Sequence, residues 1–94
     1  MMITASAPIS GEVLEFLKVV FCCPVLEAYG MSETSGATTI TKGEDPVCGH
    51  VGGPVQACAI RLRDLPEMEY LSTDKPYPRG EICMRGPMVT KGYF

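Results

Sequence analysis

The sequence is poor in the residues that supply large contact surfaces and positive charge. It has no tryptophan, one histidine and only 7% aromatic residues in 94. Its eight lysines and arginines are scattered and the net charge is −3, whereas binding along a nucleic acid requires clustered basic side chains. We therefore expect no nucleic-acid partner.

Long apolar runs are absent as well. The longest, residues 19–23 followed by residues 24–26, falls far below the roughly 20 apolar residues of a membrane-spanning helix. The N-terminus, residues 1–4, carries neither a basic region nor a long apolar segment, which excludes a secretory signal. These absences predict no transmembrane segment in this chain and an intracellular location.

Paired cysteine motifs are missing too. The cysteines are odd in number and show no C-x-x-C spacing: Cys22, Cys23, Cys48, Cys58 and Cys83. This pattern favours reduced thiols in a cytosolic setting over a disulfide framework. Cys48 and His50 resemble half of a zinc site, but no second half stands at ligand spacing, so a loop thiol beside an imidazole is the better interpretation.

The first half of the sequence predicts a strand, a helix and a second strand, in that order. Ser10 stands where a helix N-cap belongs, and residues 11–22 follow the helical period until Pro24 ends it. We expect this helix to pack on a sheet through one apolar arc, which comprises Val13, Leu14, Leu17, Val20 and Phe21. A helix on a membrane surface is the alternative, which the glutamates of its polar face disfavour.

A short apolar strand over residues 24–28 runs into a predicted loop at Tyr29 and Gly30. In α/β sheets ligands bind beyond the carboxyl ends of strands, so this loop is the expected ligand site. Residues 27–36 supply an aromatic ring, glycine, hydroxyls and a carboxylate, which suit a purine, a phosphate and its metal ion. Residues 38–41 form a further β-prone segment.

The second half has antiparallel β character. Residues 55–64 alternate as a half-buried strand, residues 81–85 form a second strand, and residues 89–94 begin a third element. We thus predict an α/β fold: a strand-helix-strand fragment of a larger sheet domain, followed by an antiparallel, barrel-like segment. Residues 1–46 would end an α/β subdomain, and residues 47–94 would begin a β subdomain.

Four ordered motifs carry a family resemblance. They are Ala5-Ser6-Ala7-Pro8-Ile9-Ser10, Tyr29-Gly30-Met31-Ser32-Glu33-Thr34, Gly49-His50-Val51-Gly52-Gly53-Pro54, and the stretch from Pro78-Arg79-Gly80-Glu81 to Lys91-Gly92-Tyr93-Phe94. Over essentially the whole chain they resemble the AMP-forming acyl-adenylating (AMP-dependent synthetase/ligase) superfamily, and within it most closely the long-chain fatty acyl-CoA synthetases. The second motif alone is far less specific than four in order.

The resemblance implies the reaction of a fatty acid with ATP and coenzyme A to give acyl-CoA, AMP and pyrophosphate. ATP/AMP and Mg²⁺ are the implied cofactors, with coenzyme A as co-substrate. The implied location is the cytosol or the cytosolic face of the endoplasmic reticulum or peroxisome, and membrane association of the whole enzyme is left open.

The family's site carries over onto nine residues. Tyr29 would lie against the adenine, Gly30 would allow close approach of the backbone, and Met31 would contribute main chain beside the nucleotide. Ser32, where threonine is usual, would contact the α-phosphate, and Glu33 would hold Mg²⁺. Ser32 and Glu33 are thus the predicted catalytic residues. The other predicted cofactor-binding residues are Ser6, Ala7, Pro8 and Ala28.

Each of these residues also has a purely structural interpretation. Tyr29 could belong to the core, Gly30 to a turn, and Ser32 with Glu33 to the start of a short helix. Ala7 and Pro8 could simply end a strand.

The chain departs from the family pattern at two alanines. Ala5 stands where glycine is usual, so a positive φ there would be strained. Ala28 also replaces a glycine usual in long-chain members, and its methyl group could narrow the acyl channel.

The resemblance further implies parts that this sequence does not contain. The phosphate loop with its lysine would lie upstream, and the ribose-binding aspartate, the hinge and the catalytic lysine would lie downstream. We therefore expect a segment of the large N-terminal domain that is inactive in isolation. A short non-catalytic nucleotide-binding or regulatory protein derived from such an enzyme is the alternative.

Overall fold

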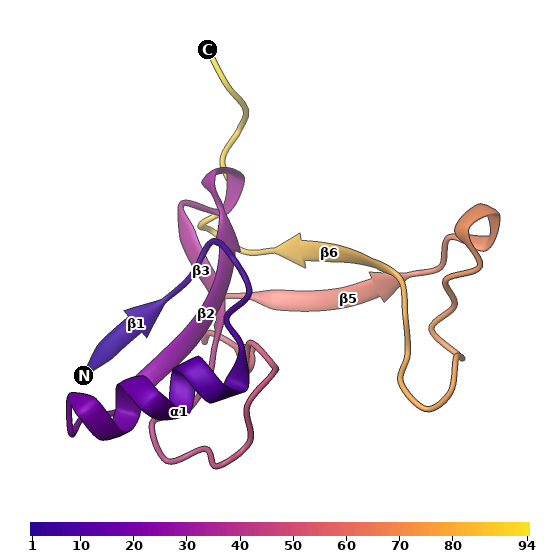
Figure 1. The fold of residues 1–94 in the computed structure, drawn as a ribbon. Helices are drawn as coiled ribbons and strands as arrows, with labels where there is room; N and C mark the ends of the chain where they lie inside the picture. The colour runs from indigo at the N-terminus through magenta and orange to yellow at the C-terminus, as the bar shows by residue number, and fades with distance from the viewer.

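The computed structural model describes all 94 residues and arranges them in two sheets, one α-helix and two short 3₁₀ helices (Figure 1). In chain order these are β1 (Met2–Thr4), α1 (Gly11–Val20), β2 (Val25–Met31), η1 (Ser32–Thr34), β3 (Gly36–Ile40), β4 (Gly53–Pro54), β5 (Ala59–Arg63), η2 (Pro66–Met68) and β6 (Glu81–Arg85). The predicted mixture of α/β and antiparallel β structure is confirmed.

Helix α1 begins where the sequence predicts. Ser10 is extended (φ −71°, ψ 146°), and its hydroxyl accepts a hydrogen bond from the Val13 N–H at 3.3 Å. This satisfies one of the free amides of the first turn. The helix ends at Val20, two residues before the predicted end, because Cys22 turns the chain toward β2 with a positive φ of 46°.

The larger sheet has the strand order β1-β2-β3-β4. Strand β1 pairs in parallel with β2, and α1 is the crossover that joins them (Figure 1). Strands β2 and β3, and then β3 and β4, pair antiparallel. The first half is therefore a mixed sheet, with one parallel pair at the end that carries the helix.

The predicted loop at Tyr29 and Gly30 is wrong, because β2 continues through both residues to Met31. Tyr29 pairs with Thr39, and Gly30 pairs with Ala37, with a shift of register between the two pairs. Hydrogen bonding to the following strand keeps this stretch extended. The turn is thereby reduced to η1 and Ser35, whose φ of 54° lies in the left-handed region.

The second half forms a two-stranded antiparallel ribbon of β5 and β6. Its register sets Arg63 opposite Glu81, and these two side chains form an ion pair. The predicted strand over residues 81–85 is confirmed, whereas that over residues 55–64 is shorter, because residues 55–58 form a turn closed by the Cys58 N–H and the Val55 carbonyl. The ribbon does not close into a barrel, and residues 89–94 contain no third strand.

The described fold exposes much more surface than a compact domain of its mass. Its accessible surface is 7227 Å², whereas a folded monomer of 10.2 kDa exposes about 5,300 Å². Its radius of gyration is 15.1 Å, against about 12 Å for a compact chain of this length. The buried apolar core consists only of Leu14, Val25, Leu26 and Ala28.

The predicted apolar arc of α1 is only partly used. Leu14 is buried and Leu17 half-buried against the sheet, whereas Val13, Val20 and Phe21 are exposed. Helix α1 packs chiefly against β2, so only the middle of its apolar arc is covered. No helix in the structure has the length and apolar content needed to cross a membrane.

Strand β4 lies beyond the predicted subdomain boundary after residue 46, yet pairs with β3 in the larger sheet. The ribbon begins only at Ala59. The division into residues 1–46 and 47–94 stays a prediction.

Two adjacent glycines provide a test of the β3–β4 pairing. A Cβ at Gly52 (φ +75°) would lie 2.0 Å from the Ile40 carbonyl oxygen, whereas a Cβ at Gly53 would meet open space. We expect Gly52→Ala to speed hydrogen exchange of the Val55 amide, which donates to the Thr38 carbonyl, by about tenfold or more. Gly53→Ala is the control and should leave it nearly unchanged. Equal exchange rates in the two variants would contradict this account.

Candidate functional site

Two cavities adjoin near the carboxyl ends of β1 and β2. The loop cavity, of about 410 Å³, is lined by Thr4, Ser6, Ala7, Pro8, Ile9, Glu27, Ala28, Tyr29, Gly30, Gly49, His50 and Val51. The hairpin cavity, of about 660 Å³, is lined by Ala5, Ser6, Tyr29, Gly30, Met31, Ser32, Glu33, Gly36, Ala37 and Tyr93. They share Ser6, Tyr29 and Gly30 and are therefore adjacent, and the two together are called the recess.

All nine residues predicted for the site line this recess. Ser6, Tyr29 and Gly30 border both cavities, Ala7, Pro8 and Ala28 border the loop cavity, and Met31, Ser32 and Glu33 border the hairpin cavity. Their individual roles toward a ligand stay predictions. A third hollow, of about 430 Å³, lies on the β5–β6 ribbon and contains none of them.

The parallel pairing of β1 with β2 brings the first motif to the second. Thr4 lies opposite Glu27 in the register, so the chain leaving β1 runs beside the last part of β2. The positive φ falls on Ser6, at 77°, and not on Ala5, where the sequence suggested strain. A non-glycine residue in this region is uncommon, and here it turns the chain toward Ala7 and Pro8 at the cavity wall.

Gly30 is required by the close approach of two strands. A Cβ there would lie 2.0 Å from the carbonyl oxygen of Gly36. Gly30 also follows the register shift that separates it from Tyr29. The half-buried Tyr29 can thus border both cavities while its carbonyl accepts a 3.0 Å hydrogen bond from the Thr38 hydroxyl.

The turn that presents Ser32 and Glu33 is held by the buried Thr34. Its hydroxyl accepts from the Met31 N–H at 3.1 Å and lies 2.9 Å from the carbonyl oxygens of both Met31 and Gly36. The alternative prediction, a short helix that begins at Ser32, is confirmed, since η1 spans Ser32–Thr34. Ser32 and Glu33 remain exposed on it, so the helical turn and a ligand role are compatible.

Two buried threonines provide a matched test of this turn. Thr34→Val removes an acceptor from the Met31 N–H, and we expect it to destabilise the hairpin tip by about 1–3 kcal/mol. Thr39→Val is the control, because the buried Thr39 hydroxyl has no hydrogen-bond partner, so its loss should be neutral or stabilising. Native-state hydrogen exchange at the Met31 amide measures the difference. Similar protection in the two variants would show that the Thr34 hydroxyl does not hold the turn.

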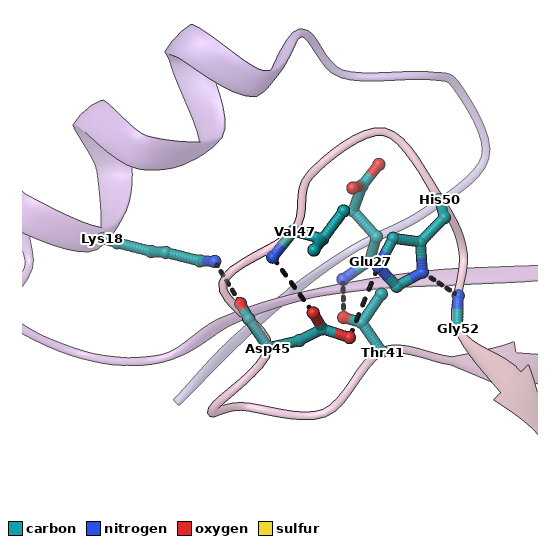
Figure 2. Close-up of polar contacts among 7 residues, drawn as sticks. All are labelled: Lys18, Glu27, Thr41, Asp45, Val47, His50 and Gly52. Atoms are coloured by element: carbon teal, nitrogen blue, oxygen red, sulfur yellow. Dashed lines mark hydrogen bonds and ion pairs between the residues drawn. The ribbon is translucent and has the colours of Figure 1, made fainter.

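Polar contacts anchor residues 42–52, of which Gly49, His50 and Val51 line the loop cavity (Figure 2). The Lys18 ammonium on α1 donates to the Asp45 carbonyl at 3.5 Å, and the Asp45 carboxylate accepts from the Val47 N–H at 3.0 Å. His50 Nδ1 accepts from the Gly52 N–H at 3.1 Å, and its Nε2 lies 3.4 Å from the Asp45 carboxylate. Since Nδ1 accepts, the proton of a neutral His50 sits on Nε2, facing Asp45. The imidazole thus holds the loop. The structure contains no cluster of three or more His, Cys, Asp or Glu side chains that could hold a metal ion.

Tyr93 is a site residue to which the sequence assigned no role. Its hydroxyl donates to Glu33 Oε1 at 2.9 Å, and the Thr90 N–H donates to the Glu33 carbonyl at 2.7 Å. Tyr93 stands in the last quoted motif, but sequence alone gave no signal that it meets Glu33, 60 positions away. Only the return of the chain from β6 to the hairpin tip brings them together (Figure 1).

The contact between Tyr93 and Glu33 shifts the pKa values of both side chains. Hydrogen bonds from the Glu33 backbone and from the Tyr93 hydroxyl hold the pKa of the Glu33 carboxyl below its ordinary 4.5. The hydrogen bond to Glu33, loss of hydration and the carboxylate charge raise the pKa of Tyr93 above its ordinary 10.0. The contribution of Glu33 is lost as pH falls through its lowered pKa, and that of Tyr93 as pH rises through its raised pKa. The contact therefore persists across the neutral range.

We expect Tyr93 to titrate above pH 10, and to return toward its ordinary pKa in Glu33→Gln, which removes the charge. ¹³C NMR of tyrosine Cζ measures this, with the Tyr93 signal assigned by its loss in Tyr93→Phe. An unchanged titration in Glu33→Gln would contradict the contact.

The recess fits one mode of magnesium binding. Glu33 is the one acidic side chain of the hairpin cavity, and Mg²⁺ is commonly bound through one or two carboxylates plus phosphate oxygens and water. The donor set thus suits an ion carried by a phosphate ligand and not an all-protein cage. Neither cavity is lined by lysine or arginine, so the cations that phosphate chemistry needs are not supplied by these residues.

A family model described as AMP-binding enzyme matches residues 1–94. This chain belongs to the AMP-binding enzyme family. Among curated proteins it is 52% identical over 92 residues to fatty acyl-CoA synthetase A of Dictyostelium discoideum, and 50% identical over 91 residues to the peroxisomal long chain acyl-CoA synthetase 7 of Arabidopsis thaliana. The resemblance to long-chain fatty acyl-CoA synthetases is confirmed.

Solved structures share the fold. The chain is 29% identical to O-succinylbenzoate coenzyme A synthetase (MenE) from Bacillus subtilis in complex with ATP and magnesium ion, with a TM-score of 0.77, covering 98% of this chain and 18% of that one. It is 33% identical to the A domain of carboxylic acid reductase from Segniliparus rugosus in complex with AMP and a co-purified carboxylic acid, with a TM-score of 0.72, covering 98% of this chain and 13% of that one.

The alignments cover nearly all of this chain but only a small part of each relative. It covers 98% of this chain and 14% of the Dictyostelium protein, and 97% of this chain and 13% of the Arabidopsis protein. The chain therefore spans about a seventh of the length of these relatives.

Proposed function

We propose that this chain is a segment of a long-chain fatty acyl-CoA synthetase, in which it forms one wall of the ATP/AMP site. The complete enzyme would join a fatty acid to coenzyme A with conversion of ATP to AMP and pyrophosphate. The observation that carries the proposal is that all nine residues matching the family's motifs line these two adjacent cavities, although they come from two separate stretches of the chain.

Each residue contributes a group suited to part of a nucleotide. The half-buried Tyr29 offers an aromatic face on which a purine can stack, beside the backbone of Gly30 and Met31. The exposed Ser32 hydroxyl can donate to a phosphate oxygen, and the exposed Glu33 carboxylate can ligate Mg²⁺. When bound, Mg²⁺ would neutralise charge on the phosphates. Ser6, Ala7, Pro8 and Ala28 would close the adenine side.

Physical features of the chain support its being one wall. The recess has no cationic side chain, whereas stabilising the charge of a transferring phosphate group calls for several. The fold exposes about a third more surface than a compact protein of its mass. Exposed apolar side chains gather on α1, with Phe16 63% and Val19 75% accessible. Such a surface is typical of a segment that packs against further protein.

The relatives' names support the proposed substrates and location. Coenzyme A and a fatty acid are proposed as substrates because the relatives are acyl-CoA synthetases. An intracellular location is proposed, and two relatives are named as peroxisomal. Peroxisomal surface, endoplasmic reticulum surface and cytosol are the candidates, and cell fractionation distinguishes them.

Pyrophosphate exchange into ATP, dependent on fatty acid, tests the proposal. We expect the isolated 94-residue chain to show none, and the complete polypeptide that contains it to be active. In that polypeptide Glu33→Gln should lower the exchange rate by about 100-fold, because one charge-stabilising group is lost. Glu15→Gln, on the exposed face of α1, is the matched control and should retain activity.

Turnover by the isolated chain would contradict the claim that it is one wall. A natural polypeptide restricted to these 94 residues would instead favour the alternative of a non-catalytic nucleotide-binding protein. Full activity of Glu33→Gln in the complete polypeptide would remove the metal role.

A further inference from the structure

The contact between Tyr93 and Glu33 connects the end of the chain to the proposed phosphate end of the site. The Tyr93 hydroxyl donates to Glu33 Oε1 at 2.9 Å. A second hydrogen bond supports this contact, because the nearby Thr90 N–H donates to the Glu33 carbonyl at 2.7 Å. Tyr93 is also the one residue beyond Val51 that lines either cavity of the recess. Beyond Val51 the chain therefore reaches the two cavities through this side chain alone.

We propose that Tyr93 is a positioning residue, which holds the Glu33 carboxylate in the orientation that receives a phosphate-bound divalent cation. The proposal rests on the proposed function and adds to it a residue outside the nine already assigned.

The geometry around Glu33 is what calls for such a residue. Glu33 is exposed on a single 3₁₀ turn. Tyr93 is the side chain that donates a hydrogen bond to its carboxylate. A glutamate of this kind has several rotatable bonds to immobilise before it can ligate an ion. A tyrosine has only two, so it can hold its partner at little cost in conformational freedom.

The hydrogen bond leaves room for the cation. A carboxylate has two oxygens with about four lone-pair sites. The Tyr93 hydroxyl and the Glu33 backbone each use one of these sites, so the remaining lone pairs stay available to a cation.

A role in packing alone fits Tyr93 poorly. The residue is 77% exposed, so its ring buries little apolar surface, and its hydroxyl bonds to Glu33. Burial of a ring is how a tyrosine that only stabilises a fold makes most of its contribution. What the Tyr93 hydroxyl does contribute is a fixed orientation of the Glu33 carboxylate.

Binding of Mn²⁺, a spectroscopic substitute for Mg²⁺, tests the proposal in the complete polypeptide that contains this segment. Free Mn²⁺ is measured by electron paramagnetic resonance with a non-hydrolysable ATP analogue present. We expect Tyr93→Phe to weaken Mn²⁺ binding by about fivefold, as for loss of one hydrogen bond to an exposed carboxylate. Tyr77→Phe is the control, because Tyr77 is 78% exposed and lines neither cavity.

A double-mutant cycle separates positioning from general loosening. In the Glu33→Gln background Tyr93→Phe should have no further effect on Mn²⁺ binding. In steady-state assays Tyr93→Phe should raise the Mg²⁺ concentration for half-maximal rate while the rate at saturating Mg²⁺ stays close to that of the unmodified enzyme.

Three outcomes would overturn the proposal. Unchanged or tighter Mn²⁺ binding in Tyr93→Phe, with weakened binding in Glu33→Gln, removes the positioning role and leaves the proposed function intact. An equal effect of Tyr93→Phe with and without Glu33 shows that Tyr93 acts elsewhere. Unchanged Mn²⁺ binding in Glu33→Gln removes both the positioning role and the metal role in the proposed function.

Discussion

The antiparallel pairing of β2 with β3 around a single 3₁₀ turn is the constraint on which the site depends. It keeps residues 29–31 extended although the register shifts between Tyr29 and Gly30. Threonine hydroxyls make this irregularity tolerable, because Thr38 and Thr41 bond to backbone groups of β2 and Thr34 bonds within the turn. Backbone polar groups that a regular ladder would satisfy are met by side chains instead. Exposed Ser32 and Glu33 can then stand on a rigid support.

The recess is assembled from four short stretches held by different interactions. Parallel pairing brings residues 5–9 beside β2, and the Asp45–His50 contact holds residues 49–51 across from them. The Tyr93–Glu33 contact adds the fourth stretch. None of the four supplies a cation to the lining, and little of the chain's apolar surface is buried. A chain of this kind is better understood as part of a larger site than as a site by itself.

Local signals explain which elements could be predicted. The N-cap at Ser10, the helical period and the alternation over β6 are encoded within a few residues, so the α/β character and these elements were anticipated. The predictions that were wrong depend on distant partners. The arc of α1 is only partly buried because the helix packs chiefly against β2, and Tyr29 lies in a strand because Thr39 pairs with it. Neither fact can be read from the neighbouring sequence.

Sequence by itself therefore determined the family and the nine candidate residues, since ordered motifs preserve residue types whatever the surroundings. Tertiary structure alone decided that these residues meet in one recess, that Thr34 serves the turn, and that Tyr93 touches Glu33. The physical reason is that contacts across 60 positions arise from strand pairing and chain return, which no local pattern encodes. The exposed faces were decided in the same way, because burial depends on what a helix or strand finds to pack against.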